Sequence, residues 1–158
     1  DELFLHFLKD MYYAERAILK SLPDLIGAAQ RETLKQALQH HAEETKGQVE
    51  RLDRVFKALG QPAEGVTCEA MVGLLQESDD ALKESGNAGV IRDAAIIACA
   101  QAVEHYEIAR YGTLAQWAKD MGRAEVASLL ERSLQEEKQA DATLNQIAEG
   151  GVNKAAGV

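Results

Sequence analysis

The sequence predicts an all-α protein, and three observations support that class. Good helix formers such as alanine, leucine, glutamate, lysine and glutamine dominate, while aromatic residues make up 5% and there are two prolines. No run of alternating β-branched residues indicates a strand. With 46% hydrophobic residues over 158 positions, the chain can bury a substantial core. We therefore expect one globular helical domain over residues 1–149, followed by a flexible C-terminal tail over residues 150–158.

The first expected helix has an apolar stripe that advances in steps of four and three residues, as in a bundle helix. A single acid, Glu15, lies in the middle of this stripe. Pro23 removes a backbone hydrogen bond near its end, which predicts a kink or a helix end between residues 21 and 28. The apolar positions of the stripe are Phe4, Leu8, Met11, Ile18, Leu22 and Leu25.

The second expected helix starts near Arg31 and has polar residues at the centre of its stripe. These are His41, Thr45 and Gln48, and Glu44 flanks them. Glycines and a proline over residues 60–65 then interrupt the helical pattern. A shorter amphipathic helix follows and extends to about residue 85, with Thr67 as its expected N-terminal cap.

The third and fourth expected helices are separated by a tight turn at Gly122. The third begins after the glycine-rich residues 86–89 and has Glu104 at its midpoint. The fourth has Glu137 at its midpoint. Short connections near residues 28–31 and 120–123 imply two antiparallel helix pairs. The connection between the pairs, about 28 residues long, can cross the length of the bundle. A helix pair, a long crossover with a short extra helix and a second pair form the connectivity of a ferritin-like four-helix bundle.

Four acids at matching depth are the strongest functional signal. Antiparallel neighbours bring their midpoints to one level, so Glu15, Glu44, Glu104 and Glu137 should meet in one layer of the core. Glu107 lies three residues after Glu104 and projects toward the same site. Burying a carboxylate costs several kcal/mol unless something offsets the charge. A divalent metal bridged by carboxylates from several helices would do so.

Other interpretations of these side chains stay open. A single glutamate beside an apolar stripe is commonly a surface residue, and a polar core without metal could be held by Tyr12, Tyr106, Tyr111 and Arg110. His41 and Asp141 are further candidate ligands, but a lone histidine on a stripe is commonly a hydrogen-bonded core residue. Gln48 is a weak ligand and is expected outside the coordination shell.

Charge and motifs exclude several functions. The net charge of -9, without a basic stripe, disfavours nucleic acid and anionic membranes as partners. No apolar run is long enough to span a bilayer, so a cytoplasmic protein is expected. The two cysteines lack metal-ligand spacing and are expected to be reduced. There is no phosphate-binding loop, dinucleotide-binding fingerprint or serine nucleophile motif, and the sequence assigns no catalytic residue.

Residues 9–15, 41–52, 104–112 and 135–141 resemble the corresponding strings of the bacterial YciE/YciF-like family, and the likeness extends over nearly the whole chain. The resemblance implies a ferritin-like four-helix bundle, a homodimer, a link to stress responses and a dinuclear metal site. In the wider di-iron carboxylate pattern, two helices carry Glu-x-x-His motifs. Here Gly47 and Ala140 stand where those histidines are expected. Glu107 resembles an additional carboxylate of rubrerythrin-like proteins.

The leading functional prediction is a carboxylate-bridged, dinuclear site for iron or manganese, with redox chemistry on O2 or peroxide if the protein is an enzyme. Its expected ligands are Glu15, Glu44, Glu104, Glu107, Glu137, His41 and Asp141. The alternative is a non-catalytic dimeric stress or structural protein with a polar core layer. Iron storage is a third interpretation, and it requires a closed shell of many subunits.

Overall fold

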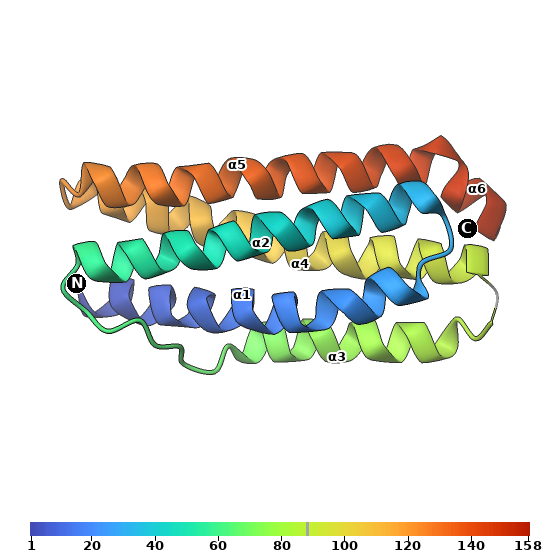
Figure 1. Cartoon of the computed structure of the whole chain (residues 1–158), viewed down its shortest axis with the longest axis horizontal. Helices are drawn as coiled ribbons and strands as arrows, with labels where there is room; N and C mark the ends of the chain where they lie inside the picture. Colours follow the sequence, from blue (N-terminus) through green and yellow to red (C-terminus); the bar gives the residue numbers. More distant parts are fainter. Residues whose placement is uncertain (88) are drawn as a thin grey trace.

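The computed structural model describes residues 1–87 and 89–158, and its regular elements are all helical (Figure 1). This confirms the predicted all-α class. The four long helices and the extra helix lie where the hydrophobic pattern predicts them. The elements are α1 (Glu2–Ala28), α2 (Glu32–Ala58), α3 (Glu69–Glu84), α4 (Gly89–Asp120), α5 (Ala124–Ile147), the π-helical turn η1 (Ala148–Val152) and α6 (Asn153–Ala156).

The four long helices pack as a ring in the order α1, α2, α5, α4, and α3 packs on the outside against α4 and α1. From α1 to α5, each helix runs in the direction opposite to that of the previous one (Figure 1). The segment after α2 follows the outside of the bundle, and α3 returns the chain to the end where α4 begins. This arrangement has the expected connectivity of two antiparallel pairs joined by a long crossover.

Short turns join the helices within each pair. In the turn between α4 and α5, Gly122 has a φ of 70°, a left-handed conformation that glycine adopts without steric cost. In the turn between α1 and α2, the backbone N–H groups of Gln30 and Arg31 donate to the carboxylate of Asp93, at 2.7 and 2.9 Å. Asp93 is fully buried near the start of α4. It therefore anchors the first helix pair to the second.

The N-terminal cap of α3 differs from the expectation by one residue. Cys68, not Thr67, is the cap, and its Sγ accepts a hydrogen bond from the backbone N–H of Met71 at 3.3 Å. Cys68 is 1% exposed, so its side chain packs into the core as well as capping the helix. Cap preferences favour threonine over cysteine. Burial of the sulphur decides the position here.

The C-terminal segment continues the helical path after α5. Ala148 and Val152 are buried, and Val152 has no exposed surface. The guanidinium of Arg31 donates to the carbonyl of Gly151 at 3.2 Å, which ties this segment to the start of α2. The flexibility expected for residues 150–158 stays a prediction. These contacts place the first part of that segment against the bundle.

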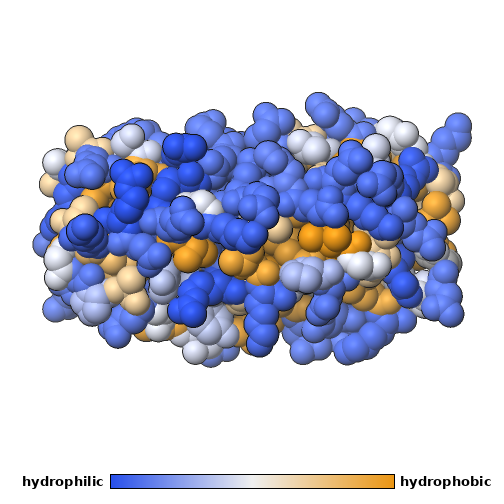
Figure 2. All heavy atoms as spheres, viewed as in Figure 1, coloured by the Kyte–Doolittle hydropathy of each residue, from blue (hydrophilic) through white to orange (hydrophobic). Residues whose placement is uncertain are grey.

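The surface is predominantly polar on the face seen in Figure 2, with apolar atoms gathered along the middle of that face. Inside, leucines, isoleucines, phenylalanines and methionines from α1 to α5 form one continuous core. Polar side chains interrupt the core at mid-height, where α1, α2, α4 and α5 approach one another. The fold therefore positions a polar layer between two apolar halves.

Candidate metal centre

Five potential ligands of the polar layer are almost completely removed from solvent. Glu107 and Glu137 have no exposed surface, Glu15 is 1% exposed, Glu104 is 2% exposed and His41 is 7% exposed. They come from all four long helices, with Glu15 on α1, His41 on α2, Glu104 and Glu107 on α4, and Glu137 on α5. The structure thus brings these predicted residues together at one level.

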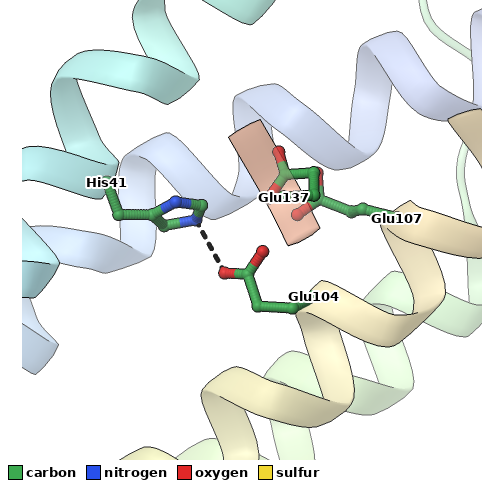
Figure 3. Close-up of side chains that lie close together, drawn as sticks. All are labelled: His41, Glu104, Glu107 and Glu137. Carbon is green, nitrogen blue, oxygen red and sulfur yellow. Dashed lines mark ion pairs between the residues drawn. The ribbon is translucent and has the colours of Figure 1, made fainter. Parts of the chain in front are cut away.

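Four of them form a compact group of donor atoms. His41, Glu104, Glu107 and Glu137 each offer one ligand atom, and these atoms all lie within 4.8 Å of one another. Figure 3 shows the four side chains converging from three helices. His41 Nε2 lies 3.0 Å from Glu104 Oε1. A cation at the centre of such a group could be reached by all four side chains.

Local helix geometry explains this convergence. Glu104 and Glu107 are three residues apart, so both side chains lie on one face of α4. Glu137 follows the stripe of Val126, Leu130 and Ser133 on α5, all of which are buried. Since that stripe faces the core, a carboxylate in the next position must enter the core as well. The apolar periodicity of each helix thus determines the depth of its acid.

Glu15 lies at the same level and is held by a hydrogen bond. The hydroxyl of Tyr111, which is fully buried on α4, donates to Oε1 of Glu15. This bond fixes one carboxyl oxygen, while Oε2 of Glu15 has no hydrogen-bond partner among the described residues. Tyr111 can therefore orient the Glu15 carboxylate and leave one oxygen for a ligand.

Most oxygens of the layer lack hydrogen-bond partners. Both carboxyl oxygens of Glu107 and of Glu137, and Oε2 of Glu104, are buried and accept no hydrogen bond from the part of the chain that the structure describes. The same holds for Nδ1 of His41. Native proteins pair nearly all buried polar groups, since each unpaired one costs roughly 1–3 kcal/mol or more. Protons or cations are therefore needed to compensate the negative charge and the unpaired oxygens of this cluster.

Burial makes these carboxyl groups bind protons tightly. It raises the pKa of Glu15 to about 8, with a further contribution from the negative charge of Glu137. Burial also raises the pKa of Glu104 to about 7. The pKa values of Glu107 and Glu137 are raised well above the ordinary value, again chiefly by burial. Without a cation, several of the four carboxyls therefore hold protons at neutral pH.

His41 responds to the same surroundings in two ways. Burial disfavours the charged imidazolium, but the nearby carboxylates of Glu44, Glu137 and Glu15 favour it, and the pKa of His41 is raised overall. A proton on His41 compensates part of the negative charge. A bound metal would have to displace that proton from the coordinating nitrogen.

Two predicted ligands lie at the edge of the layer. The side chain of Glu44 is 17% exposed, and its carboxylate contacts His40 Nε2 at 3.1 Å and His41 Nδ1 at 3.9 Å. The side chain of Asp141 is also 17% exposed, and its Oδ2 contacts His105 Nε2 at 3.1 Å. Neither belongs to the compact donor group. These contacts suit partners that orient ligands from outside the group.

The tyrosines and the arginine of the polar-core interpretation engage different acids. Tyr12 donates to Asp53 at 2.9 Å, and Tyr106 donates to Asp10 at 2.7 Å while accepting from Arg110 at 3.2 Å. Among these four residues, Tyr111 alone has a hydrogen bond to an acid of the layer within the described residues. Protein partners therefore satisfy little of the layer's hydrogen-bonding capacity.

A neighbouring polar cluster was missed at the level of sequence. Arg51, 8% exposed, forms an ion pair with Glu136 and donates to Ser133 Oγ at 3.1 Å. Gln48 Nε2 donates to Glu136 at 3.3 Å, which agrees with its expected place outside a coordination shell. The spacing of three residues between Gln48 and Arg51 was the available signal, since it extends the polar part of the α2 stripe.

The structure shows which side chains lie near the layer where Glu-x-x-His motifs would place histidines. In α2, the histidine precedes the glutamate, and His41 reaches the donor group while Glu44 stays at its edge. In α5, Ala140 stands three residues after Glu137 and lines a cavity next to the layer. The group therefore has one nitrogen donor and three carboxylates, with Glu15 as an adjacent fourth.

Fold and site together define a class: a helical bundle of ferritin-like connectivity with a buried carboxylate and histidine cluster at mid-height. Residues 1–157 match the family model described as a domain of unknown function, DUF892. The chain belongs to this family. It is 43% identical to the protein YciF of Escherichia coli K12 over 157 residues, which cover 99% of this chain and 94% of that protein.

Solved structures agree with this assignment. The crystal structure of the E. coli stress protein YciF matches with a TM-score of 0.91 at 44% identity, covering 97% of this chain and 96% of that one. YcfI from Rhodopseudomonas palustris, for which a structural role has been suggested, matches with a TM-score of 0.87 at 51% identity, with 90% of each chain covered. A Xanthomonas campestris protein at 23% identity shares the fold, with a TM-score of 0.70 over 97% of this chain and 92% of that one.

None of the helices in the described part of the chain combines the length and the apolar character that a membrane span requires.

Proposed function

We propose that the polar layer binds divalent iron or manganese, with up to two ions held between Glu15, Glu104, Glu107, Glu137 and His41. The main support for this proposal is the burial of the Glu107 and Glu137 carboxyl groups without hydrogen-bond partners in the part of the chain that the structure describes. All four of their carboxyl oxygens are buried, and none has a hydrogen-bond partner among the described residues. Their side chains belong to the donor group whose ligand atoms lie within 4.8 Å of one another.

Charge favours a site for two ions. Four ionised carboxylates, those of Glu15, Glu104, Glu107 and Glu137, carry four negative charges, and two divalent cations would neutralise them. Without cations, the carboxyls keep protons, as their raised pKa values indicate. Metal binding would thus exchange protons for cations in a layer that stays close to neutral.

The donor set favours hard, redox-capable ions. Carboxylate oxygens suit Mn2+ and Fe2+, one imidazole suits iron as well, and no cysteine belongs to the group. Tyr111 would hold the Glu15 carboxylate in place, and Glu44 would orient His41 from outside the donor group. A bound iron or manganese ion would supply one-electron chemistry with O2 or peroxide.

A role under stress is part of the proposal, because the E. coli relative is named a stress protein. Assembly as a cytoplasmic homodimer is a further part, which rests on the family likeness. The strip of apolar atoms on the face seen in Figure 2 is the kind of surface that homodimers bury. Analytical ultracentrifugation tests the dimer: a single species of twice the chain mass supports it, and a monomer at micromolar concentration contradicts it.

Metal content tests the proposed site. The wild-type protein, Glu107→Gln and Glu137→Gln are purified after growth with added manganese or iron, and bound metal is measured by plasma mass spectrometry. Glu131→Gln is the matched control, since Glu131 lies on α5, as Glu137 does, but contacts Lys119 near the surface. The proposal predicts one to two ions per chain in the wild type and the control, and much less in the two layer variants. Equal metal in all four proteins contradicts it.

One observation favours a second candidate, a metal-free structural protein. The hydrogen bond from Tyr111 to Glu15 and the raised pKa values of the acids allow a neutral, proton-sharing core layer. A structural role has been suggested for the R. palustris relative. The two candidates differ in thermal unfolding, because an ion that binds the native state alone must raise the melting temperature. An unchanged melting temperature with saturating Mn2+ and Fe2+ favours the structural role.

A further inference from the structure

A cavity lies directly beside the carboxylate layer, on the side of the turn between α1 and α2. Its walls in the long helices are formed by residues within 18–25 of α1, 37–44 of α2, 99–104 of α4 and 139–144 of α5. Since α1 and α5 run toward that turn and α2 and α4 run away from it, all four ranges lie on one side of the layer (Figure 1). The layer therefore closes one end of the cavity.

The wall is mainly apolar. Ile18, Leu22, Leu38, Val103 and Leu144 line it, and each is at most 7% exposed. Such side chains favour a hydrocarbon over water, because burying apolar surface releases ordered solvent.

The two hydroxyls that line the cavity from α1 and α5 are already occupied. Ser21 Oγ donates to the carbonyl of Ile18 at 2.9 Å, and Thr143 Oγ1 donates to the carbonyl of Gln139 at 2.9 Å. Neither needs a hydrogen bond from a ligand. Ser78 of α3 and Cys99 of α4 also line the cavity, but most of its surface is apolar, so the tail of a ligand there is expected to be hydrocarbon.

The layer end of the cavity has polar atoms without partners. His41 and Glu104 both line it, and both are more than nine-tenths buried. Figure 3 shows their side chains pointing toward each other from α2 and α4. Nδ1 of His41 and Oε2 of Glu104 have no hydrogen-bond partner among the described residues. Both atoms are closed to a water-sized group, so the polar group of a ligand at this end would reach them after a small rotation of either side chain.

An uncharged head group suits this end in every state of the layer. Without metal the carboxyls keep protons, and with two divalent ions bound, as proposed above, their charges are balanced, so the layer stays close to neutral in both states. A charged head group buried beside it would therefore lack a counter-charge. A hydroxyl carries no charge and both donates and accepts hydrogen bonds, so it can pair with Glu104 and with either protonation state of His41 Nδ1.

Volume limits the length of the tail. The cavity measures about 70 Å3 as the space open to the centre of a water molecule. One water-sized group occupies roughly 10–15 Å3 by this measure, so the cavity holds about five to seven non-hydrogen atoms.

We infer that this cavity is a binding site for a short-chain aliphatic alcohol of about four to six carbons, with its hydroxyl toward His41 and Glu104. Binding itself does not require metal; a role as a substrate site rests on the proposed function.

Titration of the metal-free protein with alcohols tests the inference. Amide chemical shifts are followed by NMR as 1-butanol, 1-pentanol and 1-octanol are added. The expected result is saturable binding of butanol and pentanol with a dissociation constant on the order of 1 mM, with shifts centred on the cavity residues. Octanol exceeds the volume, so the end of its tail must stay outside or displace the walls, and octanol should bind no more tightly than pentanol. Shifts that grow linearly without saturation, or tightest binding of octanol, overturn the inference.

Variants test the location. Ala140→Leu and Ala100→Leu each fill the cavity from a different helix, and both should weaken pentanol binding at least tenfold. Ala142→Leu and Ala102→Leu are the matched controls, because these alanines are exposed on the same two helices. The length series on the wild type needs no variant, so the inference stays testable if a filled variant folds poorly. Unchanged binding in both filled variants overturns the assigned location.

Head-group selectivity separates this inference from the metal site. Butylammonium and butyrate are compared with 1-butanol, on metal-free protein and on protein exposed to Mn2+. The inference predicts that butanol alone binds in both conditions. Stronger binding of either ion in both conditions contradicts the assigned head group. Alcohol binding to the metal-free protein with no metal uptake would refute the proposed function and leave the cavity assignment standing.

Discussion

His41 Nε2 lies 3.0 Å from Glu104 Oε1, and this contact joins α2 to α4 at the level of the carboxylate layer. The imidazole is the one nitrogen donor in the group of four potential ligands. Its neighbour His40 has a side chain that is 75% exposed and contacts Glu44 outside the group. Two adjacent histidines thus differ in depth, and this difference provides a matched pair for mutation.

We expect His41→Gln to weaken binding of Mn2+ by about tenfold or more, because the change removes a ligand atom from the centre of the donor group. His40→Gln should bind as the wild type does, within about a factor of three. Competition titration with a fluorescent chelator measures both affinities. Equal losses in the two variants would mean that His41 has no special place in the site.

The metal-free protein should lose stability as the pH rises from 5 to 8. Glu104 and Glu15 have folded pKa values of about 7 and about 8, above the ordinary 4.5 that applies to the unfolded chain. The folded state therefore binds more protons between these values. The contribution of Glu104 and Glu15 to the stability of the fold is fully present below pH 4.5. It is lost as the pH rises through their folded pKa values. The free energy of unfolding in urea should fall by at least about 2 kcal/mol from pH 5 to pH 8.

The control for this pH dependence is a variant that cannot titrate. Glu104→Gln should show a shallower fall than the wild type, while Glu131→Gln, near the surface, should keep the full slope. A stability that rises between pH 5 and pH 8 in metal-free wild type would show that the layer stays ionised without cations.

Replacement of a layer acid by a hydrocarbon should stabilise the metal-free protein. Glu137 has no exposed surface and no hydrogen-bond partner among the described residues, so Glu137→Leu removes a buried polar group of similar size. We expect a gain of roughly 1–4 kcal/mol at pH 8, together with loss of metal binding. Chemical denaturation measures the first and metal analysis the second. A destabilised Glu137→Leu would indicate that the carboxyl contributes to the metal-free core.

Asp93→Ala should destabilise the fold without altering the donor group. The change leaves two backbone N–H groups, those of Gln30 and Arg31, without their buried acceptor. Loss of these charge-assisted hydrogen bonds should cost about 2–4 kcal/mol. Asp79→Ala, at an exposed position of α3, should change stability by less than about 0.5 kcal/mol. Guanidinium titration distinguishes the two variants, and equal effects would contradict the anchoring role of Asp93.

Hydrophobic periodicity was sufficient to predict the helices and the depth of the layer. Glu15, Glu104 and Glu137 occupy stripe positions, and His41, Thr45 and Gln48 fill the polar centre of the α2 stripe; all of these residues are buried. Because the stripe of a bundle helix must face its neighbours, its positions predict most of the side chains that enter the core. That they bind metal stays a prediction.

Contacts between helices could not be predicted in the same way. Glu44 lies beside the α2 stripe, and Asp141 lies on the predicted α5 stripe, one turn beyond Glu137. The distance of each from the donor group depends on the rotation and spacing of whole helices. Arg51 with Glu136, and Asp93 with the turn before α2, pair residues that are 85 and 62 or more positions apart. A single sequence does not show which distant residue is the partner of Arg51 or of Asp93. Cys68 as the cap of α3 follows from tertiary burial, which local cap preferences do not include.

An anomalous difference map tests the central claim most directly. Crystals of the wild-type protein grown with Mn2+ are measured with X-rays near the manganese absorption edge. The account predicts one or two strong peaks within about 2.5 Å of carboxylate oxygens of Glu104, Glu107 and Glu137. Well-diffracting crystals with saturating Mn2+ and no peak in the layer would contradict it.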